Sequence, residues 1–301
     1  DVYYMNPLKP EETRLVLEVK GGGWRINDIS SDGKKLIIGE YVSANESHLY
    51  LFDTETQKLQ SITDRNEKQI VQGSAKFAKN PDEIWYVTDR DNEFDRLATL
   101  NLKTKKISYF TSAIPWEVSG YTLSKDKSKI AFETNESGLN KLYLMDTNSK
   151  KYSEIKGLPV GLVNNFDFTD DGKSLFFSQS TYDSSADIYR LDLASGKIER
   201  WTDSEQGEMQ KADMSQPKLI EWKSFDGMKI TGFYYPVSKK FTGKRPVLIN
   251  IHGGPEGQSM ASSLGSGNYY TNEMGVALIS PNVRASSGFG KTYTARDNGF
   301  N

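Results

Sequence analysis

The sequence contains no cysteine and only two histidines, His48 and His252. The absence of cysteine excludes disulfide bonds, a thiolate nucleophile and cysteine-ligated metals, and it leaves the cellular compartment open. With two histidines and no cysteine, we expect no metal site. A phosphate-binding glycine loop is also missing, because the segment Gly288–Thr292 (GFGKT) lacks the first glycine and a preceding strand. We therefore expect no cofactor.

Neither a charge excess nor a long hydrophobic run is present. Lys and Arg number 38 against 40 Asp and Glu, which gives a net charge of −2. Without a basic stripe we expect no nucleic-acid partner. The longest apolar runs, such as Val247–Ile251 and Val276–Ile279, are too short to cross a bilayer, so we expect no membrane partner. The chain begins in the middle of a pattern, with DVYYMNPLKP, which predicts that an upstream part is missing.

What the sequence does have is an internal repeat. A polar turn runs into an apolar strand four times, and the first apolar residues lie 48, 46 and 45 residues apart. A second marker, a short strand ending in Asp or Asn, keeps a similar period. The four first apolar residues are Leu36, Ile84, Ile130 and Leu175.

Each repeat has the size of one β-propeller blade, with four short strands in about 45 residues. Asp-Gly or Asn-Pro-Asp supplies the tight turns, and alternation such as Leu142 and Leu144 indicates strands with one buried face. Residues 3–20 resemble the closing half of an earlier blade. We predict about four and a half blades over residues 1–217, since the units lack the periodicity of a helical solenoid.

The last third changes character. Leu219–Pro236 predicts a hairpin with its turn at Asp226-Gly227. Pro246–Ile251 is apolar on both faces, which predicts a strand in the middle of a covered sheet. About Tyr269–Met274 we expect the end of a helix, and Val276–Ser280 is a second buried strand. This order of elements is typical of an α/β domain.

The motifs SFDG, INIHGGPEGQ, PNVRASSGFGKTY and DNG follow the repeats in this order. The whole chain thereby resembles the prolyl oligopeptidase family of serine peptidases, strongly from Ser224 to Gly299 and weakly in each repeat. The resemblance implies that residues 1–217 belong to a propeller and residues 218–301 to the N-terminal part of an α/β-hydrolase domain. It also implies that the propeller restricts access to short peptides. The dipeptidyl signature is absent, which favours an acylaminoacyl-peptidase-like or oligopeptidase-like subgroup.

By this resemblance the backbone N–H of Gly254 helps to form the oxyanion hole, with Gly253 and Pro255 shaping the loop and His252 holding it by hydrogen bonds. A plain turn after a strand is the alternative.

Arg284 contacts either a substrate carboxylate or the loop itself, and the second role is favoured. Glu256 contacts a substrate amine or is a solvated carboxylate. Ala285 stands where the family usually has glycine, so we expect a different backbone angle there.

The nucleophile and the general base are missing. No Gly-x-Ser-x-Gly occurs, and GQSMA (Gly257–Ala261) lacks the last glycine and a preceding strand. His252 precedes any possible nucleophile elbow, whereas the base should follow it. His48 occupies a repeat position that is filled elsewhere by Arg96, Lys141 and Asp187, which predicts a solvated strand start.

We therefore expect part of a serine hydrolase that cleaves short peptides or acyl-peptides through an acyl-enzyme, inactive as these 301 residues alone. The alternatives are a non-catalytic β-propeller binding protein and an esterase of the same fold. The expected partners are a peptide substrate and either further copies of the chain or complementing segments of the same protein, because the two predicted α/β strands lack cover.

Overall fold

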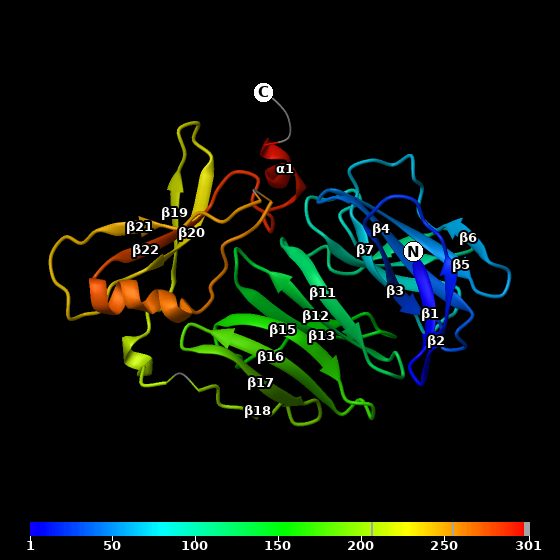
Figure 1. Ribbon diagram of the computed structural model, residues 1–301, viewed down its shortest axis with the longest axis horizontal. Helices are drawn as coiled ribbons and strands as arrows, with labels where there is room; N and C mark the ends of the chain where they lie inside the picture. Colours follow the sequence, from blue (N-terminus) through cyan, green and yellow to red (C-terminus); the bar gives the residue numbers. More distant parts are fainter. Residues whose placement is uncertain (206, 255, 298–301) are drawn as a thin grey trace. The chain divides into compact units, whose positions relative to one another are not determined.

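The computed structural model describes residues 1–205, 207–254 and 256–297. The chain divides into two compact units, Asp1–Pro115 and Trp116–Asn301 (Figure 1). The strands of the first unit are β1 (Val2–Asn6), β2 (Lys9–Leu17), β3 (Trp24–Ile29), β4 (Lys35–Ser43), β5 (Glu46–Asp53), β6 (Lys58–Ser61), β7 (Gln72–Phe77), β8 (Glu83–Thr88), β9 (Arg96–Asn101) and β10 (Ile107–Tyr109).

The second unit begins with two more groups of four strands and ends with a mixed region. Its strands are β11 (Glu117–Leu123), β12 (Lys129–Asn135), β13 (Asn140–Asp146), β14 (Tyr152–Glu154), β15 (Gly161–Phe168), β16 (Ser174–Thr181), β17 (Ser184–Asp192), β18 (Ile198–Arg200), β19 (Lys218–Lys223), β20 (Lys229–Tyr235), β21 (Val247–Ile249) and β22 (Ala277–Asn282). Short helical segments are η1 (Lys211–Asp213), η2 (Gly265–Gly267), η3 (Tyr270–Met274), α1 (Lys291–Thr294) and η4 (Ala295–Asp297).

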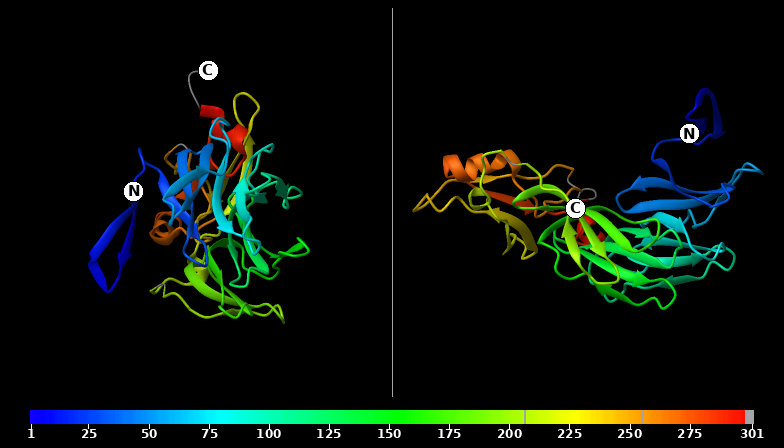
Figure 2. Two further views of the ribbon diagram at one scale, coloured as in Figure 1. Left: turned by 90° about the vertical axis from the view of Figure 1, so that its right-hand side faces the viewer. Right: turned by 90° about the horizontal axis from the view of Figure 1, so that it is seen from below.

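Each predicted repeat is one four-stranded antiparallel sheet. The strands of each sheet follow one another in chain order, and the first apolar residue of every repeat lies in the second strand of its sheet. The hairpin of β1 and β2, dark blue in Figure 2, is the half unit that precedes them. The prediction of about four and a half repeats is confirmed for the described residues.

Neighbouring sheets within a unit bury their apolar faces against each other. In the first unit Ile37 and Leu49 of one sheet share a core with Ile84, Tyr86 and other residues of the next. The sheet of β11–β14 and the sheet of β15–β18 share a second core in the same way. Burying a side chain of this size contributes about 1.5–3 kcal/mol. The repeats therefore stabilise one another, since a lone four-stranded sheet would leave one of these faces in water.

The prediction of a solvated strand start at His48 is wrong. His48 is fully buried, and its Nε2 lies 3.1 Å from Oε1 of Glu46. The equivalent residues Arg96 and Asp187 are also buried, each with its own hydrogen-bond partners. Lys141, the fourth residue at this position, is only partly buried and pairs with Glu136. The position accepts different polar side chains because each one finds a polar partner in the fold.

The last sheet has the order β19-β20-β22-β21, with β21 and β22 parallel and the other pairs antiparallel. The predicted hairpin is confirmed, and Gly227 has the positive φ of 84° that its turn requires. Helical structure ends at Met274, as expected, with Gly275 in the left-handed conformation after it. None of the described helices is long and apolar enough to span a membrane.

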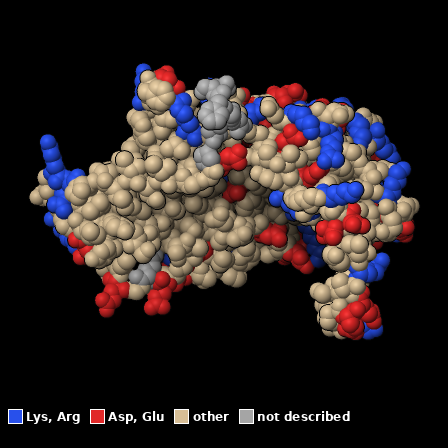
Figure 3. Space-filling model, turned by 45° about the horizontal axis from the view of Figure 1, so that its top comes forward, with Lys and Arg blue, Asp and Glu red and all other residues tan. Residues whose placement is uncertain are grey.

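One prediction for this sheet is wrong within the described residues. We expected β21 in the middle of a covered sheet, but it is an edge strand, and its three residues are 41–60% exposed. Ile251, Tyr269 and Met274 are exposed as well. Figure 3 shows few charged side chains over this part of the unit. A sequence pattern indicates that a strand is apolar on both faces, but it does not indicate which segments pack against it.

Candidate functional site

The segment predicted to stabilise an oxyanion follows the last sheet's parallel pair. Val247 pairs with Ala277 and Ile249 with Ile279, so the carboxyl ends of β21 and β22 lie at the same edge. Residues 250–254 leave β21 at this edge, and residues 283–290 leave β22 there. In α/β sheets this edge is where ligands bind. The sequence motifs HGGPEG and VRASSGFG therefore meet in space.

Gly254 has a backbone conformation that only glycine adopts easily. Its φ is 131°, and an added Cβ would lie 2.7 Å from the backbone nitrogen of Glu256. Gly253 and Gly254 are both exposed. Within the described part of the chain, no acceptor pairs with the N–H of Gly254. This loop can thus offer a backbone donor to a bound group.

His252 ties this loop to the segment after β22. The Nε2 of His252 lies 2.8 Å from Oγ of Ser286, whose hydroxyl donates to the carbonyl of Val283 at 2.7 Å. The Nδ1 of His252 also lies 3.2 Å from the carbonyl of Gly253, so both ring nitrogens are within hydrogen-bond distance of this loop or of the segment after β22. The N–H of Ser287 donates to the carbonyl of Gly257 at 3.0 Å and closes a second link. These bonds link residues 252 and 257 to the segment after β22.

The contact between Ser286 and His252 does not have the arrangement of a catalytic pair. Ser286 is fully buried, and the carbonyl of Val283, 2.7 Å from its Oγ, competes with the imidazole for its hydroxyl hydrogen. The other ring nitrogen of His252 faces the carbonyl of Gly253 at 3.2 Å, where a catalytic histidine would face a carboxylate. A serine in this environment cannot reach a substrate carbonyl.

Arg284 is engaged by the hairpin of β19 and β20. Its guanidinium donates to both carboxylate oxygens of Asp226 at 2.8 Å and to Oγ of Ser224 at 3.0 Å. The hydrogen bonds from Arg284 hold the pKa of Asp226 well below its usual range. The ring of Phe225 lies 4.7 Å from the guanidinium carbon. Of the two roles we considered, these contacts favour the structural one.

Three further residues of the predicted site remain: Ala285, Glu256 and Pro255. Ala285 is fully buried and has a φ of 65°. This alanine adopts the left-handed conformation that glycine prefers. Glu256 is exposed. Pro255 lies outside the described residues.

Sequence reasoning missed three of the residues that hold this loop. Asn282, fully buried, accepts from the N–H of Ser259 at 2.7 Å and donates back to its carbonyl at 3.2 Å. Asn282 and Ser286 both lie in the motif PNVRASSGFG, where their polarity after a buried strand was the available signal. Asn135, which binds Gln258, lies in the third repeat, and no local pattern distinguishes it.

The described residues also include a partly buried carboxyl outside this site. Burial raises the pKa of Glu133 on β12 to about 7, although a hydrogen bond from Ser119 opposes the shift. Its Oε2 accepts from Nδ2 of Asn140 at 3.3 Å on the neighbouring strand. No described histidine or candidate nucleophile contacts it, so we assign Glu133 no catalytic role.

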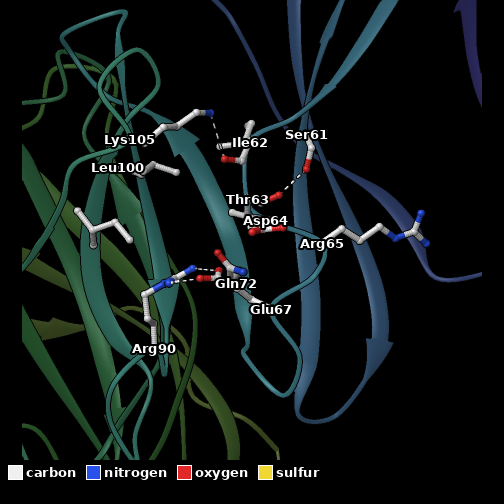
Figure 4. A pocket seen from close by; sticks show the side chains of 11 residues that line it. Ser61, Ile62, Thr63, Asp64, Arg65, Glu67, Gln72, Arg90, Leu100 and Lys105 are labelled. Carbon is white, nitrogen blue, oxygen red and sulfur yellow. Dashed lines mark hydrogen bonds and ion pairs between the residues drawn. The ribbon is translucent and has the colours of Figure 1, made fainter.

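A cavity of about 580 Å³ lies in the first unit, between the first two sheets (Figure 4). Its cations already have partners: Arg90 binds Glu67, Arg65 binds Glu40, and Lys105 donates to a backbone carbonyl. No candidate residue of the sequence analysis lines it. Among the described residues, no group of three or more His, Asp or Glu side chains could hold a metal ion.

Comparisons with known proteins identify the repeats. The family described as "Prolyl oligopeptidase, N-terminal beta-propeller domain" matches residues 8–204. No curated protein matches the sequence.

Solved structures show a similar fold over most of the chain. A puromycin hydrolase is 18% identical, with a TM-score of 0.76 over 89% of this chain. A structure from a study of two prolyl endopeptidases is 17% identical, with a TM-score of 0.80 over 95%. A puromycin-hydrolyzing peptidase of Mycobacterium tuberculosis is 15% identical, with a TM-score of 0.78 over 95%. The chain spans 42%, 42% and 45% of these proteins, respectively.

Proposed function

Because the chain belongs to the prolyl oligopeptidase family, we propose that it supplies the propeller and the first part of an α/β-hydrolase domain to a serine peptidase. The propeller comprises residues 1–217, and residues 218–301 begin the hydrolase domain. The parallel pair of β21 and β22, joined to the hairpin of β19 and β20, supports the second assignment. The substrates are short peptides or acyl-peptides, which fits the peptidases among the structural neighbours.

The conformation of Gly254 carries the proposal. Acyl transfer places negative charge on the carbonyl oxygen, and backbone N–H groups stabilise that charge in the transition state. Gly254 offers such a donor at the carboxyl edge of the sheet, on a loop that His252 and Ser286 hold in place. The serine nucleophile, its carboxylate partner and the catalytic histidine come from other segments of the whole protein. The reaction then passes through an acyl-enzyme.

The segments that carry the serine, the carboxylate and the histidine would pack against the exposed side of the last sheet. The exposed edge of β21 carries unpaired backbone groups and apolar side chains, which further parallel strands and helices would cover. In their absence, copies of the chain associate through the same surface.

The substrate class is tested on the whole protein with a peptide p-nitroanilide and a p-nitrophenyl ester of the same acyl group. We expect kcat/KM for short peptides to fall steeply when the peptide is embedded in a folded protein, since the propeller restricts access. Turnover of the ester without any turnover of the peptide would favour an esterase instead. Tight binding of a peptide without turnover of either compound would favour a binding protein.

A further inference from the structure

The turn between β12 and β13 in the third sheet is tight and projects onto the last sheet. Glu136 and Leu139 exchange backbone hydrogen bonds around Ser137 and Gly138, whose φ angles are 57° and 87°. Two consecutive positive φ values are typical of a two-residue hairpin loop. An added Cβ on Gly138 would lie 2.7 Å from the ring of Phe233 on β20. The tip of this hairpin therefore touches the sheet that carries the candidate oxyanion loop.

Hydrogen bonds continue this contact into the loop. The carbonyl of Gly138 accepts from the N–H of Ala261 at 2.9 Å. Nδ2 of Asn135 donates to Oε1 of Gln258 at 2.6 Å, and Oδ1 of Asn135 accepts from the N–H of Gly138 at 2.9 Å. Asn135 is only 6% exposed. One buried amide thus fixes its own hairpin and the segment that follows the candidate loop.

A third segment closes over this pair. An added Cβ on Gly288 would lie 2.6 Å from Nδ2 of Asn135 and from both terminal atoms of Gln258. Gly288 follows Ser286 and Ser287, the two residues that bind His252 and Gly257. The hairpin, residues 257–261 and residues 286–288 therefore meet at the amide pair of Asn135 and Gln258.

This junction belongs to one repeat. Asn135 lies five residues after the first apolar residue of its repeat, and the same position in the other repeats holds Tyr41, Asp89 and Ser180. None of these three side chains is an amide. The junction is consequently not part of the general repeat pattern.

We infer that the hairpin of the third repeat positions the oxyanion loop of the proposed peptidase, with Asn135 and Gln258 as the positioning residues. The inference rests on the proposed function. The pair contacts no reacting atom, and it acts on the loop that carries Gly254. Because an oxyanion donor is used in the transition state and not in substrate binding, loosening the pair lowers kcat and leaves KM unchanged.

The test compares Asn135→Ala, Gln258→Ala and the double variant with the wild-type whole protein. Ser180→Ala, at the same position of the fourth repeat, is the matched control. Hydrogen exchange at amides 257–261 is expected to accelerate about tenfold in all three variants and to be unchanged in the control. On a peptide p-nitroanilide, kcat is expected to fall about tenfold at constant KM, because small displacements of catalytic groups have large effects. The double variant is expected to lose no more than either single variant.

The two readouts separate failure of the inference from failure of the proposed function. Unchanged exchange in Asn135→Ala would overturn the inference, whatever the activity does. Accelerated exchange with unchanged kcat, or a change in KM alone, would show a structural contact without a positioning role and would also overturn it. If the wild-type protein has no peptidase activity, the proposed function fails and the inference about catalysis fails with it, while the exchange data still report whether the hairpin holds the loop.

Discussion

Replacing Gly254 by alanine is expected to lower kcat of the whole protein by about 10²–10³-fold, the loss typical of one oxyanion donor. The φ of 131° is strained for any residue with a Cβ, and that Cβ would lie 2.7 Å and 2.9 Å from the backbone nitrogens of Glu256 and Gly257. The backbone must move, and the N–H of residue 254 moves with it. Steady-state kinetics on a peptide p-nitroanilide measure the effect, and KM is expected to change little.

Gly265→Ala provides the matched control for this prediction. Gly265 also has a positive φ, of 51°, but an added Cβ meets nothing within 4 Å. The control adds the same methyl group at another positive φ without displacing the loop, and we expect it to keep nearly full activity. Equal losses of kcat in the two variants would show that the Gly254 effect is general destabilisation.

Replacing Asp187 by asparagine is expected to lower the free energy of unfolding by about 3 kcal/mol at pH 7, as for breaking a buried charge pair. Asp187 is fully buried and accepts hydrogen bonds from Thr202 and from the N–H of Ser204, at 2.9 Å and 2.8 Å, and it pairs with Arg200. Burial alone would raise the pKa of Asp187. The hydrogen bonds, first from Ser184, outweigh burial and hold the pKa well below its usual range.

This shift predicts the pH dependence of the effect. A depressed pKa in the folded state contributes stability above the unfolded value of 3.8, and that contribution is lost as the pH falls below it. Urea unfolding at pH 7 and at pH 3 should therefore show the difference between wild type and Asp187→Asn shrinking at the lower pH. The exposed Asp170, paired with Lys125, is the control, and Asp170→Asn should cost less than about 1 kcal/mol. A difference for Asp187→Asn that is the same at both pH values would contradict the assignment.

The sequence predicted the repeats and the last hairpin because both depend on local signals. Turn residues at a fixed period locate the sheets, and Asp226-Gly227 locates the hairpin. Local signals did not predict that His48 is buried or that β21 is exposed. Both depend on which other segments pack against the strand. Comparing residue types across repeats detects variation but not the partner that each side chain finds.

In the candidate site too, residues of one local motif were predictable, and residues brought together only by the fold were not. The glycines and His252 lie in one short motif after a strand, so their grouping was predictable. Asn135 and Gln258 are 123 residues apart, and only the folded chain brings them together. Ala285 shows a further limit: its φ of 65° is left-handed although the residue is not glycine, and the residue type alone does not predict this angle.

We propose that residues 252–254 belong to the oxyanion side of a serine-hydrolase site and that the nucleophile is not among the 301 residues. Treatment with a fluorophosphonate that reacts with activated serines, followed by intact-mass measurement and peptide mapping, tests it directly. We predict no adduct on the 301-residue chain and one adduct per molecule of the whole protein, on a serine outside this chain. A stoichiometric adduct on the chain itself, at Ser286 beside His252 or at Ser259, would contradict the claim.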